Sequence, residues 1–190
     1  MVAIIDLWLP IILSAVAVFF TSSMLHMVLT YHRADYQKLA DEDAVLDALA
    51  PLDLPPGDYT FPHCVSPSDF QKDGVAEKFN RGPVGMMTVF PKGPPAMGKP
   101  LAQWFVFTLV VSGFVAYIAT RALPPGADYL AVFQIVGATA FGAYALGGVP
   151  NSIWYQRQWG TTLRFVFDGF VFGCLTAGFF AWLWPSALTA

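Results

Sequence analysis

Residues 7–31 read LWLPIILSAVAVFFTSSMLHMVLTY and contain no Asp, Glu, Lys or Arg. At about 1.5 Å of rise per helical residue, this stretch is long enough to cross the ~30 Å hydrocarbon core of a membrane. Three more uncharged apolar runs follow, at residues 101–120, 129–149 and 169–190. The sequence therefore predicts an all-α integral membrane protein. It forms one membrane domain over residues 1–190, a four-helix bundle with spans at approximately 7–31, 101–121, 129–149 and 165–185.

The composition agrees with a membrane protein. Hydrophobic residues make up 56% of the chain and charged residues only 12%, whereas about a quarter of the residues of a soluble domain are charged. The net charge is −3, and the basic residues form no stripe of the kind that nucleic acid requires. Lipid is the expected main solvent, and nucleic-acid binding is excluded.

The distribution of the ten Lys and Arg residues predicts the orientation in the membrane. Two of them, Arg157 and Arg164, lie between the third and fourth runs, and Arg121 alone lies on the opposite side. Because basic residues concentrate in cytoplasmic connections, we expect both termini outside and the connection 32–100 in the cytoplasm, in a cell inner membrane. The other seven lie between the first and second runs: Arg33, Lys38, Lys72, Lys78, Arg81, Lys92 and Lys99.

The long connection 32–100 is expected to be mostly irregular. Its first part continues the apolar periodicity of the first helix as far as Leu49, and Pro51 should end that helix. Ten prolines then lie between residues 51 and 100, leaving room for a short helix capped by Ser66 and a short strand at Val84–Phe90. The separated aromatic residues must pack on something, which is either the ends of the chain's own helices or a partner protein.

Polar side chains within the spans indicate a candidate site. Ser22, His26 and Thr30 recur at a spacing of four, which predicts one polar stripe on the first helix. His26 lies about 7–8 Å and Asp168 about 6 Å inside the same membrane face at helical rise. We therefore expect His26 and Asp168 to meet across the first and fourth helices. The predicted inner-leaflet polar site comprises His26, Asp168, Arg164, Gln103 and Thr30, with Asn151 in the same layer.

Two interpretations of this layer stay open. A histidine beside a carboxylate can hold a metal or relay a proton. The alternative is structural, with interhelical hydrogen bonds and a local ion pair between Arg164 and Asp168 at a spacing of four.

Cofactor chemistry has few other candidates. A transmembrane haem with two histidine ligands is not expected, since the other three runs contain no histidine. His32, His63 and Cys64 are weak candidates for a mixed nitrogen and sulfur metal site. The common catalytic motifs are absent from the sequence.

Small residues at a spacing of four predict where helices approach closely. Gly169, Gly173 and Ala177 form such a ridge on the fourth run, and Thr139, Ala143 and Gly147 form one on the third. The ridges either join these two helices or leave a face for a partner.

Together these features favour a non-enzymatic multi-pass membrane protein, a subunit or assembly factor of a larger membrane complex. The expected partners are the lipid bilayer and either a membrane-protein partner or a second copy of the chain. The alternative is a small oligomeric transporter or metal-handling protein built around His26, Asp168 and Arg164.

Overall fold

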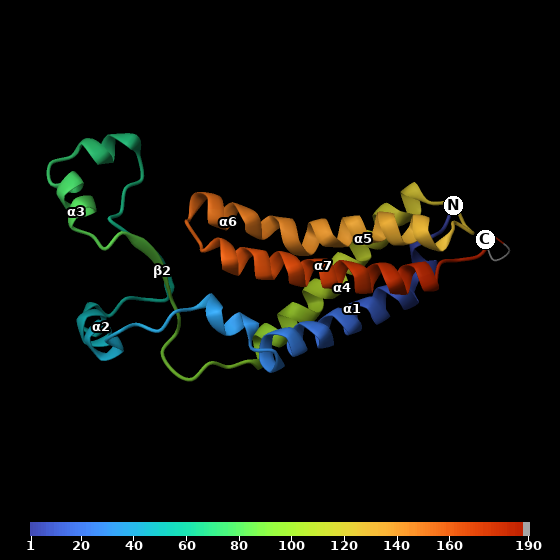
Figure 1. Cartoon of the computed structure of the whole chain (residues 1–190), viewed down its shortest axis with the longest axis horizontal. Helices are drawn as coiled ribbons and strands as arrows, with labels where there is room; N and C mark the ends of the chain where they lie inside the picture. The colour runs from blue at the N-terminus through green and yellow to red at the C-terminus, as the bar shows by residue number, and fades with distance from the viewer. Residues whose placement is uncertain (188–190) are drawn as a thin grey trace. The chain divides into compact units, whose positions relative to one another are not determined.

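The computed structural model describes residues 1–187 and is mostly helical (Figure 1). Residues 188–190, the end of the fourth uncharged run, lie outside the described residues. Four helical segments are long and apolar enough to cross a membrane, which confirms the predicted helical class and the four apolar helices. They are Ile4–Val28, Gly98–Ala122, Tyr129–Trp154 and Trp159–Trp182.

The chain divides into two compact units. The first, called here the membrane unit, comprises Met1–Tyr36 and Ala96–Ala190, and the second, the connecting unit, comprises Gln37–Pro95. The sequence assigned the whole chain to one domain with a connection at 32–100. Residues 32–36 and 96–100, at the two ends of that connection, belong to the membrane unit.

The described residues of the membrane unit include five α-helices and several short helical turns. A 3-10 turn at Ile4–Leu7 leads into the first helix, and a second at Leu146–Gly148 separates α5 from α6. The helix α5 lies along α7, while α1 packs on both α7 and α4 (Figure 1). The helices are α1 (Trp8–Ser23), α4 (Gly98–Ala122), α5 (Tyr129–Ala145), α6 (Val149–Trp154) and α7 (Trp159–Trp182).

The end of the first span differs from the prediction. After α1 the chain forms a π-helical turn at Met24–Val28, Leu29 is extended, and a 3-10 turn follows at Tyr31–Asp35. The prediction of one helix through residue 31 and on to Leu49 is therefore wrong, and Thr30 does not continue a straight polar stripe. The physical reason is that side chains of the 3-10 turn form hydrogen bonds with α7. A straight helix would place these side chains too far from α7 to form them.

The small residues of α7 pack against α5. A Cβ added to Gly169 would lie 2.6 Å from the Cβ of Ala145, and one added to Gly173 would lie 3.2 Å from the backbone of Gly137 and Phe141. Backbones this close require glycine. Ala177 is buried in the same contact, with its Cβ 3.3 Å from the Cβ position of Gly137.

On the third span, the predicted Ala143 of α5 and Gly147 of the 3-10 turn after it do not face α7. Ala143 and Gly147 are exposed, and nothing lies within 4 Å of a Cβ added to Gly147. Ala145 contacts Gly169 of α7. Ala143 and Gly147 are each two positions from Ala145, which corresponds to about 200° around a helix, so they point to the opposite side.

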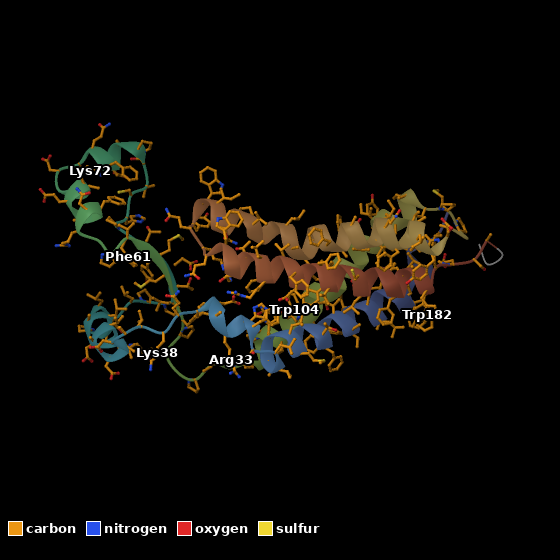
Figure 2. All side chains as sticks on the ribbon, viewed as in Figure 1. Arg33, Lys38, Phe61, Lys72, Trp104 and Trp182 are labelled. Atoms are coloured by element: carbon orange, nitrogen blue, oxygen red, sulfur yellow. The ribbon has the colours of Figure 1, made fainter. Side chains whose placement is uncertain are left out.

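The connecting unit contains more regular structure than the predicted irregular segment. It has two helices, α2 (Glu42–Leu49) and α3 (Val75–Arg81), and two strands, β1 (Gly57–Phe61) and β2 (Gly85–Val89). The strands pair antiparallel, with Phe61, labelled in Figure 2, opposite Gly85. Further 3-10 turns lie at Ala50–Leu52 and Pro67–Gln71.

Candidate functional site

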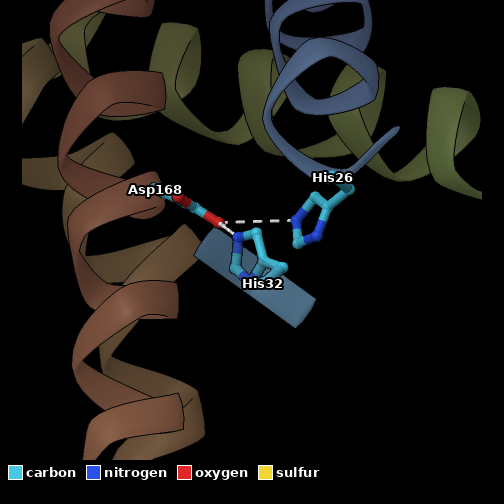
Figure 3. A group of neighbouring side chains, drawn as sticks. All are labelled: His26, His32 and Asp168. Carbon is cyan, nitrogen blue, oxygen red and sulfur yellow. Dashed lines mark hydrogen bonds and ion pairs between the residues drawn. The ribbon is translucent and has the colours of Figure 1, made fainter. Parts of the chain in front are cut away.

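Asp168 of α7 is the centre of a polar cluster at the end of the first span. Its side chain is buried, and three residues from the first 35 positions of the chain contact it. Oδ1 accepts a hydrogen bond from the Tyr31 hydroxyl, and Oδ2 lies 2.8 Å from Nε2 of His32 and 3.4 Å from Nε2 of His26. Figure 3 shows both imidazoles directed at this one carboxylate.

The irregular end of the first span brings the two histidines together. His26 lies in the π-helical turn and His32 in the 3-10 turn, with the extended Leu29 between them. Their rings stack with centroids 4.0 Å apart and planes inclined by 22°. Phe165 of α7 contacts both rings, so the pair is held against α7 by apolar as well as polar contacts.

A second carboxylate lies on the far side of His32. Oδ2 of Asp35 is 2.6 Å from Nδ1 of His32, and Oδ1 of Asp35 accepts a hydrogen bond of 2.6 Å from Nε of Arg164. The Asp35 side chain is only 4% exposed. The cluster is therefore a continuous series of contacts from Tyr31 through Asp168, His32 and Asp35 to Arg164.

Neighbouring groups fix the protonation of two cluster members outside the spans. Burial alone would raise the pKa of the Asp35 carboxyl, but the hydrogen bonds and charges of His32 and Arg164 outweigh it and hold the pKa below its usual value. Burial raises the pKa of the Tyr31 phenol well above its usual value, and the hydrogen bond to Asp168 raises it further. Asp35 is therefore an anion at neutral pH, and Tyr31 is a neutral donor.

The charge of Asp168 has no permanent counter-ion in the cluster. Among the described residues, no Lys or Arg forms an ion pair with it, since Arg164 is bound to Asp35. An ionised carboxylate only accepts hydrogen bonds. Either a proton on the facing imidazole nitrogens or a metal ion between them and Oδ2 therefore satisfies Asp168.

The donor set fits a metal ion. His26, His32 and Asp168 each offer one ligand atom, and these atoms lie within 4.8 Å of one another. Imidazole nitrogen and carboxylate oxygen suit zinc, iron(II) and manganese. Asp35 binds the second ring nitrogen of His32, which is the position that an orienting carboxylate takes in protein metal sites.

A cavity of about 390 Å³ adjoins the cluster and is lined by His26 and Asp168. Trp104 of α4, labelled in Figure 2, forms part of its wall and donates a 2.7 Å hydrogen bond from Nε1 to Ser22. The remaining lining residues are Ser23, Met27, Met97, Leu101, Phe107, Tyr144, Phe165 and Phe172.

The structure brings only part of the predicted polar site together. His26, Asp168 and Arg164 lie in the cluster, although Arg164 pairs with Asp35 and not with Asp168. The alternative of a local pair between Arg164 and Asp168 is therefore wrong, because Asp35 offers the guanidinium a closer acceptor. Gln103 and Thr30 are exposed, and no side-chain hydrogen bond among the described residues joins them to the cluster.

Three further predicted residues take other places. Asn151 accepts backbone hydrogen bonds from Tyr155 and Arg157 through its carbonyl oxygen. Both ring nitrogens of His32 face carboxylates of the membrane unit, and His63 and Cys64 belong to the connecting unit. Within the connecting unit, Nδ1 of His63 lies 3.1 Å from the Thr60 hydroxyl.

Sequence reasoning missed Tyr31 and Asp35 and considered His32 only with His63 and Cys64. The available signal was the run of Tyr31, His32 and Asp35 directly after an apolar span, with His32 and Asp35 three positions apart. Treating these residues as part of a longer helix hid this signal.

Comparison of the chain with known protein families, curated proteins and solved structures finds no match.

Proposed function

We propose that this chain is a multi-pass membrane protein that binds one divalent transition-metal ion through His26, His32 and Asp168. The observation that carries the proposal is that two imidazole Nε2 atoms lie 2.8 and 3.4 Å from the same carboxylate oxygen (Figure 3). Such separations suit atoms that bind one ion, since metal–ligand distances of about 2.0–2.2 Å put neighbouring ligands roughly 3 Å apart.

The residues around the three ligands support the same proposal. Asp35 orients His32 from its other nitrogen, and Arg164 in turn holds Asp35. The Tyr31 hydroxyl donates a hydrogen bond to Oδ1, the other carboxylate oxygen of Asp168. Each of these contacts fixes a ligand in a direction that suits coordination, as outer residues do in metal sites.

The number of ligands favours a working site over a structural one. Structural zinc sites use four protein ligands, whereas three leave a position for water or for a bound molecule. His26 is the most accessible of the three, with 37% of its side chain exposed. The ion would supply a Lewis acid at these three residues.

Elemental analysis tests the proposal directly. The chain is purified in mild detergent, loaded with zinc, iron(II) or manganese in separate samples, and freed of excess ion by gel filtration. We expect roughly one ion per chain for one of these metals and a loss of most of it in Asp168→Asn and His32→Ala. The matched control is His63→Ala, which removes a histidine outside the cluster and should leave the metal content unchanged.

Two results would overturn it. One is wild-type protein that elutes as a single folded species yet retains none of the three metals. The other is Asp168→Asn that keeps the wild-type metal content, since the amide lacks the charge that the site supplies.

We propose an orientation with both termini outside and the connecting unit in the cytoplasm of a cell that carries the protein in its inner membrane. The positive-inside rule supports it, because nine of the ten Lys and Arg residues lie between the first and second uncharged runs or between the third and fourth. Arg121, in the last turn of α4, is the exception.

A role as a subunit or assembly factor of a larger membrane complex is the second function that we propose. Exposed apolar side chains of the connecting unit favour it: Val65 is 81% exposed, Phe90 78% and Phe70 56%. Large apolar groups exposed on so small a unit suit a partner surface. Co-purification of the tagged chain from its native membrane tests it, with a partner in constant ratio expected and recovery of the chain alone contradicting it.

A further inference from the structure

The cavity beside His26 has the features of a ligand site. Its volume of about 390 Å³ falls in the range of small-molecule sites, which are mostly apolar with a few polar groups that set orientation. Here the polar groups include Ser22, Ser23, His26 and Asp168. The remaining lining residues carry apolar or aromatic side chains, so the cavity suits a molecule with one polar group on an apolar body.

The walls favour a planar ring over a simple chain. Trp104 and Phe107 stack with centroids 5.5 Å apart, and Tyr144 and Phe172 meet edge to face at 5.5 Å. Phe172 also lies 6.3 Å from Trp104. Aromatic groups arranged at these separations provide faces and edges that a further ring can pack against.

Two polar groups of the wall lack a protein partner. The Tyr144 hydroxyl is buried and forms no hydrogen bond of normal geometry among the described residues, although Ser112 is a neighbour. Nδ1 of His26 points away from Asp168 (Figure 3), and no hydrogen bond to it is formed by the described residues. An imidazole nitrogen without a protein partner can form a hydrogen bond with an oxygen-bearing ligand, as donor or as acceptor according to its tautomer.

We infer that this cavity binds a lipid-soluble molecule of the quinone or phenol class, a planar ring that carries oxygen. The ring lies among Trp104, Phe107 and Phe172, and an oxygen forms a hydrogen bond with Nδ1 of His26. The membrane that surrounds the four spans is the source of such a molecule. The inference goes beyond the proposed metal centre and shares only His26 and Asp168 with it.

Fluorescence titration with decylubiquinone in lipid nanodiscs tests the inference, because a bound quinone quenches a neighbouring indole and Trp104 lines the cavity. Saturable quenching at one site per chain is expected. Phe107→Ala removes an aromatic wall and should weaken binding about tenfold. The matched control is Phe114→Ala, seven positions along the same helix α4, which removes an exposed ring that does not line the cavity and should bind like wild type.

Quenching that never saturates, or that is equal in Phe107→Ala and Phe114→Ala, reports partitioning into lipid and overturns the inference. Displacement of the quinone by decanol as effectively as by a ring-bearing phenol also overturns it, since decanol has a chain and an oxygen but no ring. The same titration on chelator-treated wild type should retain saturable quenching. This outcome separates the two proposals. A wrong metal proposal would show in the elemental analysis, and a wrong ligand proposal would show in the titration.

Discussion

At the scale of single residues, the buried carboxylate of Asp168 is the centre of the polar cluster. Asp168 lies on a membrane-spanning helix, where an isolated charge is costly and marks a working site by default. Arg164, one turn away on α7, pairs with Asp35 instead. The cluster therefore leaves Oδ2 of Asp168 to the two histidines.

Replacement of Asp35 by Asn should weaken metal binding without removing a ligand. The substitution takes away the charge that holds Nδ1 of His32, and loss of such an orienting carboxylate typically costs about 10–100-fold in metal affinity. Competition with a chelator of known affinity measures the change. Asp128→Asn, an exposed position before α5, is the matched control, and equal affinities in the two variants would contradict the role given to Asp35.

Asp69 gives a pH prediction in the connecting unit. The Lys72 ammonium and the amide hydrogens of Ser66 and Val65 hold the pKa of the Asp69 carboxyl well below its usual range. Because the folded pKa is depressed, the stabilisation is fully present above the ordinary carboxyl pKa of about 4 and is lost as the pH falls through the folded value.

The Ser66 amide reports this carboxyl. In spectra of selectively labelled protein, the amide shift should stay constant from pH 7 to pH 4 and change only below that range. A midpoint at or above the ordinary carboxyl pKa would show that the cap does not hold in solution, and Asp69→Asn provides the reference without a titrating group.

At the scale of helices, the contact between α5 and α7 depends on a missing side chain. Gly169→Ala puts a methyl group 2.6 Å from the Cβ of Ala145, and overpacking of this kind costs about 1–3 kcal/mol. Alanine gains up to about 1 kcal/mol over glycine in helix propensity, so a net loss of stability is expected. Thermal unfolding in detergent measures it.

Gly178→Ala is the matched control on the same helix. Nothing lies within 4 Å of a Cβ at Gly178, so this variant should unfold at the wild-type temperature or slightly above it. If both variants melt together, the close approach of α5 and α7 is not what stabilises the bundle.

The helices also show what the sequence could and could not predict. Length and hydropathy identified all four spans, and the spacing of Gly169 and Gly173 identified the close face of α7, because these signals are local. The end of the first span was missed, since it depends on Asp168, which lies 136 positions from His32. The similar depth of His26 and Asp168 below one membrane face predicted their contact. The periodicity of the sequence carries no information about a partner such as Asp35.

At the scale of the whole molecule, the proposed orientation puts both ends of the membrane unit on the same side of the membrane. The basic residues predict which side, and the two cysteines of the chain make the prediction testable. Cys64 lies in the connecting unit and Cys174 within α7. In Cys174→Ala, Cys64 is the sole thiol and should be on the cytoplasmic side.

Labelling with a membrane-impermeant maleimide measures this orientation. With the protein in a bacterial inner membrane, intact spheroplasts should leave Cys64 unlabelled, while inside-out vesicles should label it. The complementary variant is Ala3→Cys in a background with both native cysteines replaced by alanine, since Ala3 is exposed near the N-terminus and should be labelled in spheroplasts. The reversed pattern would place the basic connections outside, and then the face beside the Arg164 and Asp35 pair would receive metal ions from outside the cell.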